Sequence, residues 1–125
     1  MYKVSLAIPI YNVSLFVERA LLSVLNQTYD NIEYLIVDDK GQDDSMDIVH
    51  RIIKDHPRGK DVRIIEHPYN IGLGATRNTA IDNAQGEYLF FMDSDDEIIP
   101  TCIEILVHKM QEHPVDFIAA SHMKK

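Results

Sequence analysis

The 125-residue sequence has a single cysteine, Cys102, and no apolar run as long as a membrane span. One cysteine cannot form an internal disulfide, and its spacing from the six histidines does not resemble a zinc site. A spanning helix needs about 18 or more apolar residues in a row, so we expect no membrane span. The first apolar run begins at Val4 and leaves no room for a secretory leader, which favours a cytoplasmic location.

Basic residues are scarce, with 12 Lys and Arg against 20 Asp and Glu, for a net charge of −8. Such a field repels a polyanion, so nucleic acid is excluded as an expected partner. Clustered like charges destabilise a fold unless something positive offsets them, and a divalent cation is the simplest candidate. Eight of the 20 acids fall in two short clusters: Asp38, Asp39, Asp43 and Asp44, then Asp93, Asp95, Asp96 and Glu97.

Hydrophobic periodicity predicts alternating strands and helices along one domain, residues 1–125. Apolar runs typical of buried strands lie at 4–10, 32–37, 62–65, 88–92 and 115–119. Helical spacing fills the segments between them: 14–26 with Ser14 as cap, a helix capped by Asp43 or Asp44, 74–84, and a last helix after Pro100. This alternation predicts an α/β fold, an open and mainly parallel sheet with helices on both faces.

Three loops are expected to meet at one edge of that sheet. In open parallel sheets, ligands bind beyond the carboxyl ends of the strands. Both acidic clusters follow strands, and Pro9, Tyr11 and Asn12 lie at the end of the first strand. Arg77, in the first turns of the weakly amphipathic 74–84 helix, lies near the same edge. We therefore expect the binding site there.

Asp93-Ser94-Asp95 has the spacing that lets two carboxylates share one metal ion. Hard cations such as Mg²⁺ or Mn²⁺ bind oxygen ligands and keep open positions for phosphate oxygens. With 13 Asp in the chain, one such triplet is expected by chance, and for the triplet alone a capped turn after a strand is the favoured explanation. Its place after the most apolar strand favours the metal.

The first cluster also has two interpretations. Asp39 can accept a hydrogen bond from a base or a ribose, and Tyr11 offers a flat face for a base. Alternatively, aspartates here serve turns and helix caps, and the Tyr11 ring closes the core. The 70–74 loop has neither phosphate-binding glycine pattern, and its glycines can simply allow a positive φ. No arrangement for nucleophilic catalysis is present.

Taken together in their order, these segments resemble glycosyltransferase family 2, whose donor domain has the Rossmann-like GT-A fold of nucleotide-diphospho-sugar transferases. The resemblance covers nearly the whole chain. Its motifs are Val4 to Asn12, Leu22-Ser23-Val24-Leu25-Asn26-Gln27-Thr28-Tyr29, Ile36-Val37-Asp38-Asp39, Asn70-Ile71-Gly72, Ala75-Thr76-Arg77-Asn78, Gly86-Glu87-Tyr88 and Met92-Asp93-Ser94-Asp95-Asp96.

The resemblance implies inverting, metal-dependent transfer of a sugar from a nucleoside-diphosphate sugar, with UDP as the expected nucleotide, to an acceptor hydroxyl. Mn²⁺ or Mg²⁺ is the implied cofactor. A saccharide or lipid-linked acceptor, as in polysaccharide biosynthesis, is the implied partner, and the full-length protein is expected at the inner face of the membrane. The implied nucleotide-binding residues are Pro9, Tyr11, Asn12, Asp39, Arg77 and Asp93, and the implied metal ligands are Asp93 and Asp95.

Two departures from the family pattern bear on this assignment. After Asp38-Asp39 the family usually has Gly-Ser-Thr-Asp, whereas this chain has Lys40-Gly41-Gln42-Asp43. Family members also continue into an acceptor-binding part with the catalytic base, so we expect the base beyond residue 125. The chain is then the donor half of a longer protein, inactive or weakly active alone, and exposed apolar surface at the missing part favours a homodimer.

Three alternatives remain at this point. A phospho-receiver signalling domain has a similar size, fold class and Mg²⁺-binding aspartates, but its acidic pair should follow the first strand. A nucleotidyltransferase shares the fold and the metal, but should have a loop rich in Gly, Arg and Lys after that strand. A relative that binds the donor without catalysis is the third.

Overall fold

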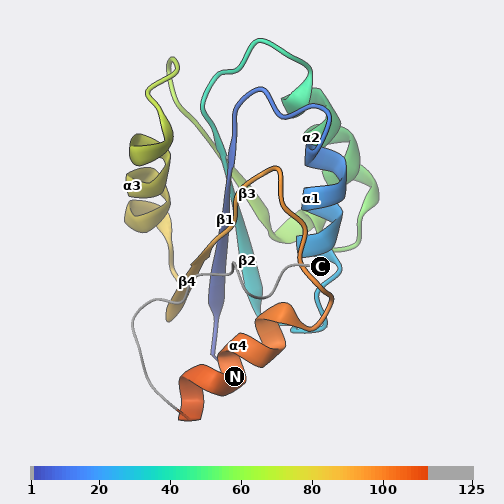
Figure 1. The fold of residues 1–125 in the computed structure, drawn as a ribbon, viewed down its shortest axis with the longest axis vertical. Helices are drawn as coiled ribbons and strands as arrows, with labels where there is room; N and C mark the ends of the chain where they lie inside the picture. The colour runs from blue at the N-terminus through green and yellow to red at the C-terminus, as the bar shows by residue number, and fades with distance from the viewer. Residues whose placement is uncertain (1, 113–125) are drawn as a thin grey trace.

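The computed structural model describes residues 2–112, and the predicted strand at 115–119 lies outside them. Strands and helices alternate as the sequence predicts (Figure 1). The strands are β1 (Val4–Ile10), β2 (Ile32–Asp38), β3 (Val62–Glu66) and β4 (Tyr88–Phe91). The helices are α1 (Val17–Leu25), α2 (Ser45–Asp55), the short 3₁₀ helix η1 (Gly59–Asp61), α3 (Leu73–Asn83) and α4 (Cys102–Glu112).

All the described strands are parallel, in the order β3-β2-β1-β4. The α/β prediction of an open parallel sheet is therefore confirmed. Val4 of β1 is level with Ile32 of β2 and with Tyr88 of β4, so three strands start together. They do not end together: β1 and β2 run on to Ile10 and Asp38, while β4 stops opposite Ala7. This step in the sheet edge positions the site described below.

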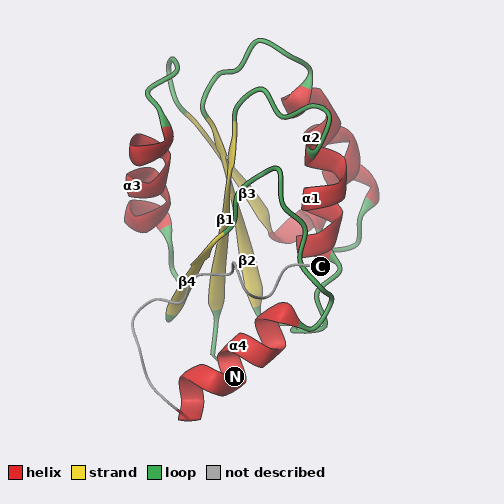
Figure 2. Ribbon diagram, in the orientation of Figure 1, coloured by secondary structure: helices red, strands yellow, loops and turns green. Residues whose placement is uncertain are grey.

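Helices cover the two faces of the sheet unequally (Figure 2). Helices α1 and α2 lie on one face, where most of the buried aliphatic side chains form the larger core. Helix α3 lies on the other face over a small core of Ala7, Leu35, Val37 and Ala80. The strands β1 and β2 are buried on both faces, which explains why their sequences are mostly apolar.

The structure corrects two predicted helix starts and distinguishes between the two candidate caps of α2. Ser14 does not cap α1: the helix begins at Val17, and Ser14 bonds Asp43 instead, its N–H donating to Oδ2 at 3.0 Å and its hydroxyl bonding the same carboxylate. Of the two candidate caps for α2, Asp43 accepts the N–H of Ser45, and Asp44 makes no side-chain cap bond. Helix α4 begins two residues after Pro100. Within residues 2–112, every helix is too short or too polar to cross a bilayer.

Candidate functional site

The cleft at the carboxyl edge begins where β4 stops short. The last ladder contact on that side is the Met92 N–H donating to the Ala7 carbonyl at 2.9 Å. Alternate residues of a strand direct their backbone groups to the same side, so the ring nitrogen of Pro9 faces the side that β4 has left. Proline has no N–H to leave unpaired there. The sequence thus ends the ladder at Ala7 and leaves the last part of β1 open as the cleft floor.

The cleft has a volume of about 500 Å³ and is lined from four loops and strand ends. Five of the residues predicted from the sequence meet in it: Pro9, Tyr11, Asp39, Asp93 and Asp95. Tyr11 is 45% exposed and so offers a surface for a flat ligand, rather than only closing the core. Apolar and acidic groups therefore lie within one cavity of a size that suits a small-molecule ligand.

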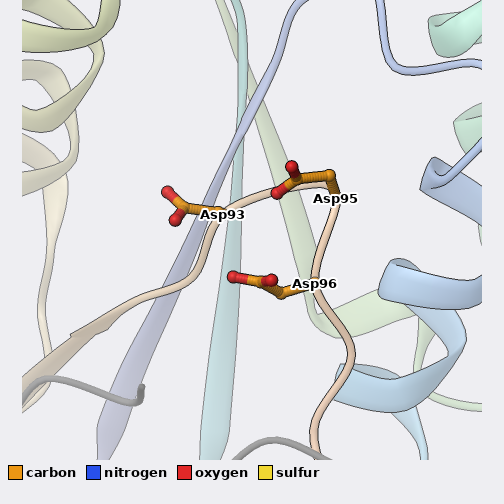
Figure 3. A group of neighbouring side chains, drawn as sticks. All are labelled: Asp93, Asp95 and Asp96. Carbon is orange, nitrogen blue, oxygen red and sulfur yellow. The ribbon is translucent and has the colours of Figure 1, made fainter.

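An acidic group lies in the turn that follows β4 (Figure 3). Asp93, Asp95 and Asp96 each offer a carboxylate oxygen, and these oxygens lie within 4.8 Å of one another. Asp93 and Asp95 are exposed, whereas Asp96 is half-buried and its N–H bonds the Asp93 carbonyl at 3.2 Å. An all-oxygen donor set suits Mg²⁺ or Mn²⁺. The residues present therefore fit the expected cation, and Asp96 joins the two predicted ligands.

Asp39 is 2% exposed and accepts four hydrogen bonds through its carboxylate. Oδ1 accepts from His67 Nδ1 at 2.8 Å and from the Ile71 N–H at 2.9 Å. Oδ2 accepts from Asn70 Nδ2 at 2.7 Å and from the Gly72 N–H at 3.0 Å. Burial raises the pKa of this carboxyl, but the bonds from His67 and the two amides outweigh it and hold the pKa below its usual value. Asp39 is therefore an ionised, acceptor-only group.

Two other predicted residues lie away from the cleft lining. Asn12 adopts a left-handed φ of 52°, and its Oδ1 accepts the Gln42 N–H at 2.7 Å, which ties the loop after β1 to the loop after β2. Arg77 is exposed on α3, and its guanidinium carbon lies 5.3 Å from the centre of the Phe91 ring. In this arrangement Arg77 stacks on Phe91 at the end of β4, two residues before Asp93.

The loop between β3 and α3 forms a wall of the cleft that the sequence patterns did not assign to the site. Asn70, Gly72, Leu73 and Thr76 all line the cavity. Gly72 has a φ of 99°, a left-handed value that favours glycine, which confirms the interpretation that a glycine here permits the turn. The polar Asn70 immediately before that turn was the available signal. Val13 and Ser94 are the remaining lining residues missed by sequence reasoning.

The unusual Lys40-Gly41 sequence forms a tight turn beside the cleft. Lys40 has a left-handed φ of 55°, and its Nζ lies 2.9 Å from Glu66 Oε2 and 3.9 Å from Asp38 Oδ2. A side chain at Gly41 would place its Cβ 2.6 Å from Asn12 Oδ1, so only glycine fits this close approach. The Lys40-Gly41 turn therefore depends on the absence of a side chain at its second position, directly after Asp38-Asp39.

Known proteins are similar to this chain in sequence and in fold. The family model described as Glycosyl transferase family 2 matches residues 5–125. A curated Escherichia coli relative, UDP-Glc:alpha-D-GlcNAc-diphosphoundecaprenol beta-1,3-glucosyltransferase WfaP, is 39% identical over 94% of this chain and 45% of its own length. A Haemophilus influenzae protein named only as an uncharacterized glycosyltransferase is 38% identical over 90% of this chain and 44% of its own.

Among solved structures, S. aureus TarS 1–349 in complex with UDP-GlcNAc matches with a TM-score of 0.79 and 28% identity, over 89% of this chain and 32% of that one. The curated relatives are longer proteins, of which this chain spans 17% to 45%. The match to the family model extends over almost the entire sequence and agrees with the parallel sheet and the acidic turn. The chain belongs to glycosyl transferase family 2.

Proposed function

We propose that this chain binds the nucleoside-diphosphate sugar, a UDP-sugar, in a glycosyltransferase that moves the sugar to an acceptor hydroxyl with inversion. The observation that carries the proposal is one cleft with an aromatic face and an ionised carboxylate near one another, and an acidic turn at its rim. These are the groups that a base, a ribose and a metal-bound diphosphate require. The TarS complex with UDP-GlcNAc supports this choice of nucleotide.

Different residues of the chain are proposed to bind different parts of the donor. Tyr11 stacks on the base, and Pro9 and Asp93 line the ribose side of the cleft. Asp39, as an acceptor-only carboxylate, favours a base with a ring N–H directed to it, so uracil and guanine are preferred over cytosine. Its two oxygens already accept four hydrogen bonds, so a base N–H would have to share an oxygen with the donors already bonded to it. Asn12 and Arg77 are proposed to act on donor binding without touching the donor, by holding neighbouring segments in place.

Asp93 and Asp95, with Asp96 beside them, would hold Mn²⁺ or Mg²⁺ between the protein and the diphosphate. When bound, a divalent cation supplies Lewis-acid stabilisation of the negative charge on the departing diphosphate. Without that charge the three clustered carboxylates would repel a nucleoside diphosphate. Metal dependence is therefore part of the proposal, and it follows from the same residues that favour the cation.

We propose that the acceptor is a saccharide or a lipid-linked saccharide and that the catalytic base lies outside residues 1–125. The WfaP relative names a diphosphoundecaprenol acceptor, which supports a lipid-linked substrate and a place for the full protein at the inner face of a membrane. A general base that takes the acceptor proton typically contributes about 10²–10⁴-fold to the rate. The isolated chain should therefore bind the donor but transfer little sugar.

Calorimetric titration of UDP, GDP and CDP tests this proposal, with Mn²⁺ and with EDTA. We expect UDP to bind in Mn²⁺ and not in EDTA, CDP to bind more weakly, and Asp95→Ala to abolish the metal-dependent part. The matched control is Asp82→Ala, which removes an exposed aspartate from α3 and should leave binding unchanged. Equal UDP binding with and without metal, or no binding of any of the three nucleotides, would contradict the proposal.

A further inference from the structure

We propose that His67 is a positioning residue of the donor cleft, acting through Asp39 to hold the wall formed by residues 70–73. This inference rests on the proposed function and deepens it, because the ligand of that wall is the nucleoside diphosphate. His67 does not line the cavity itself. Its contribution would be to fix a carboxylate and, through it, the backbone that does.

His67 joins three elements of the fold behind the cleft. It follows β3 directly, and its N–H bonds the Asp38 carbonyl at the end of β2 at 2.9 Å. Its side chain is buried, with 5% of the residue exposed, and lies between Asp39 and Thr79 of α3. Nδ1 lies 2.8 Å from Asp39 Oδ1, and Nε2 lies 2.8 Å from Thr79 Oγ1. One ring therefore connects the ends of β2 and β3 to α3.

The chemistry of the partners fixes the role of one ring nitrogen, Nδ1. Asp39 is ionised and can only accept, so Nδ1 must carry a proton and donate to it. A threonine hydroxyl can either donate or accept, so Thr79 satisfies Nε2 in either state of the ring. The bond to Asp39 is thus the one with a fixed direction and a charged acceptor, and it is the stronger of the two.

Asp39 passes this constraint on to the cleft wall. The oxygen that accepts from His67 also accepts the Ile71 N–H, and the other oxygen accepts from Asn70 Nδ2 and the Gly72 N–H. Asn70, Gly72 and Leu73 then line the cavity. The loop has no regular secondary structure from residue 67 to 72, so these bonds hold its backbone in place. Without the His67 donor, the Asp39 carboxylate can rotate. Its hydrogen bonds then no longer fix the position of the wall.

Two isosteric substitutions separate this role from simple packing. The amide nitrogen of Asn lies as many bonds from Cα as Nδ1 of histidine does, so His67→Asn retains a donor for Asp39. The amide nitrogen of Gln corresponds to Nε2, so His67→Gln retains a group for Thr79 and withdraws the donor from Asp39. His67→Leu removes both. His108→Asn, an exposed histidine on α4, controls for the substitution itself.

The experiment measures two quantities on the 125-residue chain and each variant. The first is the dissociation constant for UDP in Mn²⁺, by calorimetry. The second is hydrogen-exchange protection of the Ile71 and Gly72 amides, by ¹⁵N NMR without nucleotide, with circular dichroism melting to show that each variant is folded. We expect both the dissociation constant and the amide protection of His67→Asn to stay within about threefold of wild type. A change of that size is no larger than the loss of one weak hydrogen bond.

His67→Gln and His67→Leu should weaken UDP binding about tenfold or more, since the buried Asp39 carboxylate loses a hydrogen-bond donor. Both should also lose protection at Ile71 and Gly72. His67→Leu with wild-type protection and affinity would overturn the inference, as would equal losses in the Asn and Gln variants. If the Leu variant does not fold, the Asn and Gln pair decides.

The same data distinguish this inference from the proposed function. If wild type binds no nucleotide but protection falls in the Gln variant and not in the Asn variant, the wall is held as inferred and the donor assignment is wrong. If wild type binds UDP and the Gln variant binds equally well with unchanged protection, the donor assignment stands and the role of His67 is wrong.

Discussion

Asp95→Asn should make the metal-free protein more stable and the Mn²⁺-bound protein less stable than wild type. The three carboxylates of the turn lie within 4.8 Å of one another, so removing one charge removes two repulsive pairs. At that separation in water each pair costs about 0.9 kcal/mol, and salt at 0.1 M reduces the two together to about 1 kcal/mol. Part of this repulsion persists in the unfolded chain because the residues are neighbours in sequence.

These terms convert into a measurable shift of the thermal midpoint. For a domain of this length, 1 kcal/mol corresponds to about 4 °C, so we expect the variant to melt about 2–4 °C higher than wild type in EDTA. A ligand present at 100 times its dissociation constant stabilises by about 2.7 kcal/mol, which is roughly 10 °C here. Wild type should gain that increment in Mn²⁺, and Asp95→Asn should gain little of it. The order of the two midpoints therefore reverses on adding the metal.

Differential scanning calorimetry in EDTA and in Mn²⁺, at about 0.1 M salt, measures both midpoints. Asp82→Asn provides the comparison, because it removes one exposed carboxylate from α3 and should shift the midpoint equally with and without metal. Two results would refute the reasoning. A variant that melts below wild type in EDTA would show that Asp95 stabilises the turn rather than straining it. An equal Mn²⁺ increment in both proteins would place the metal elsewhere.

Three further changes have expected outcomes. Tyr11→Ala should weaken UDP binding about tenfold while Tyr11→Phe retains it, because stacking on a base contributes about 1–3 kcal/mol; equal losses in calorimetry would reject stacking. Desolvation raises the pKa of Asp43, but hydrogen bonds outweigh it and lower the pKa from 3.8 to about 2, so its stabilisation is present above pH 4 and is lost as the pH falls toward 2. Asp43→Asn should flatten the fall of the melting temperature in that window, and an unchanged slope would assign the acid sensitivity to other groups. Lys40→Gly should be about 1 kcal/mol more stable than Lys40→Ala in urea unfolding. Both variants lose the ion pair with Glu66, but only glycine accepts the φ of 55° without strain. Equal stabilities would mean that the turn relaxes.

Most of the fold could be predicted because its signals are local and repeated. Each strand of the sheet reads as an apolar run and each helix as a 3.6-residue period, so element type and order were accessible from the residues alone. The first turn of α1 was not, since Ser14 has an N-cap side chain but bonds a long-range partner, Asp43, instead of the start of the helix. A cap depends on geometry that a distant loop can override. The family match also decides against the phospho-receiver and nucleotidyltransferase alternatives.

The site was predictable to the extent that it depends on strand ends, and not where it depends on a loop's internal bonds. Pro9, Asp39 and Asp93 lie at the ends of strands whose register the fold dictates, and they meet in the cleft as that register requires. The wall at Asn70 and Gly72 is positioned instead by bonds to a carboxylate 31 and 33 residues earlier in the chain. No periodicity encodes such a contact. It also gives the second aspartate of the Asp38-Asp39 pair a structural reason for being there, one that applies whether or not a base contacts it.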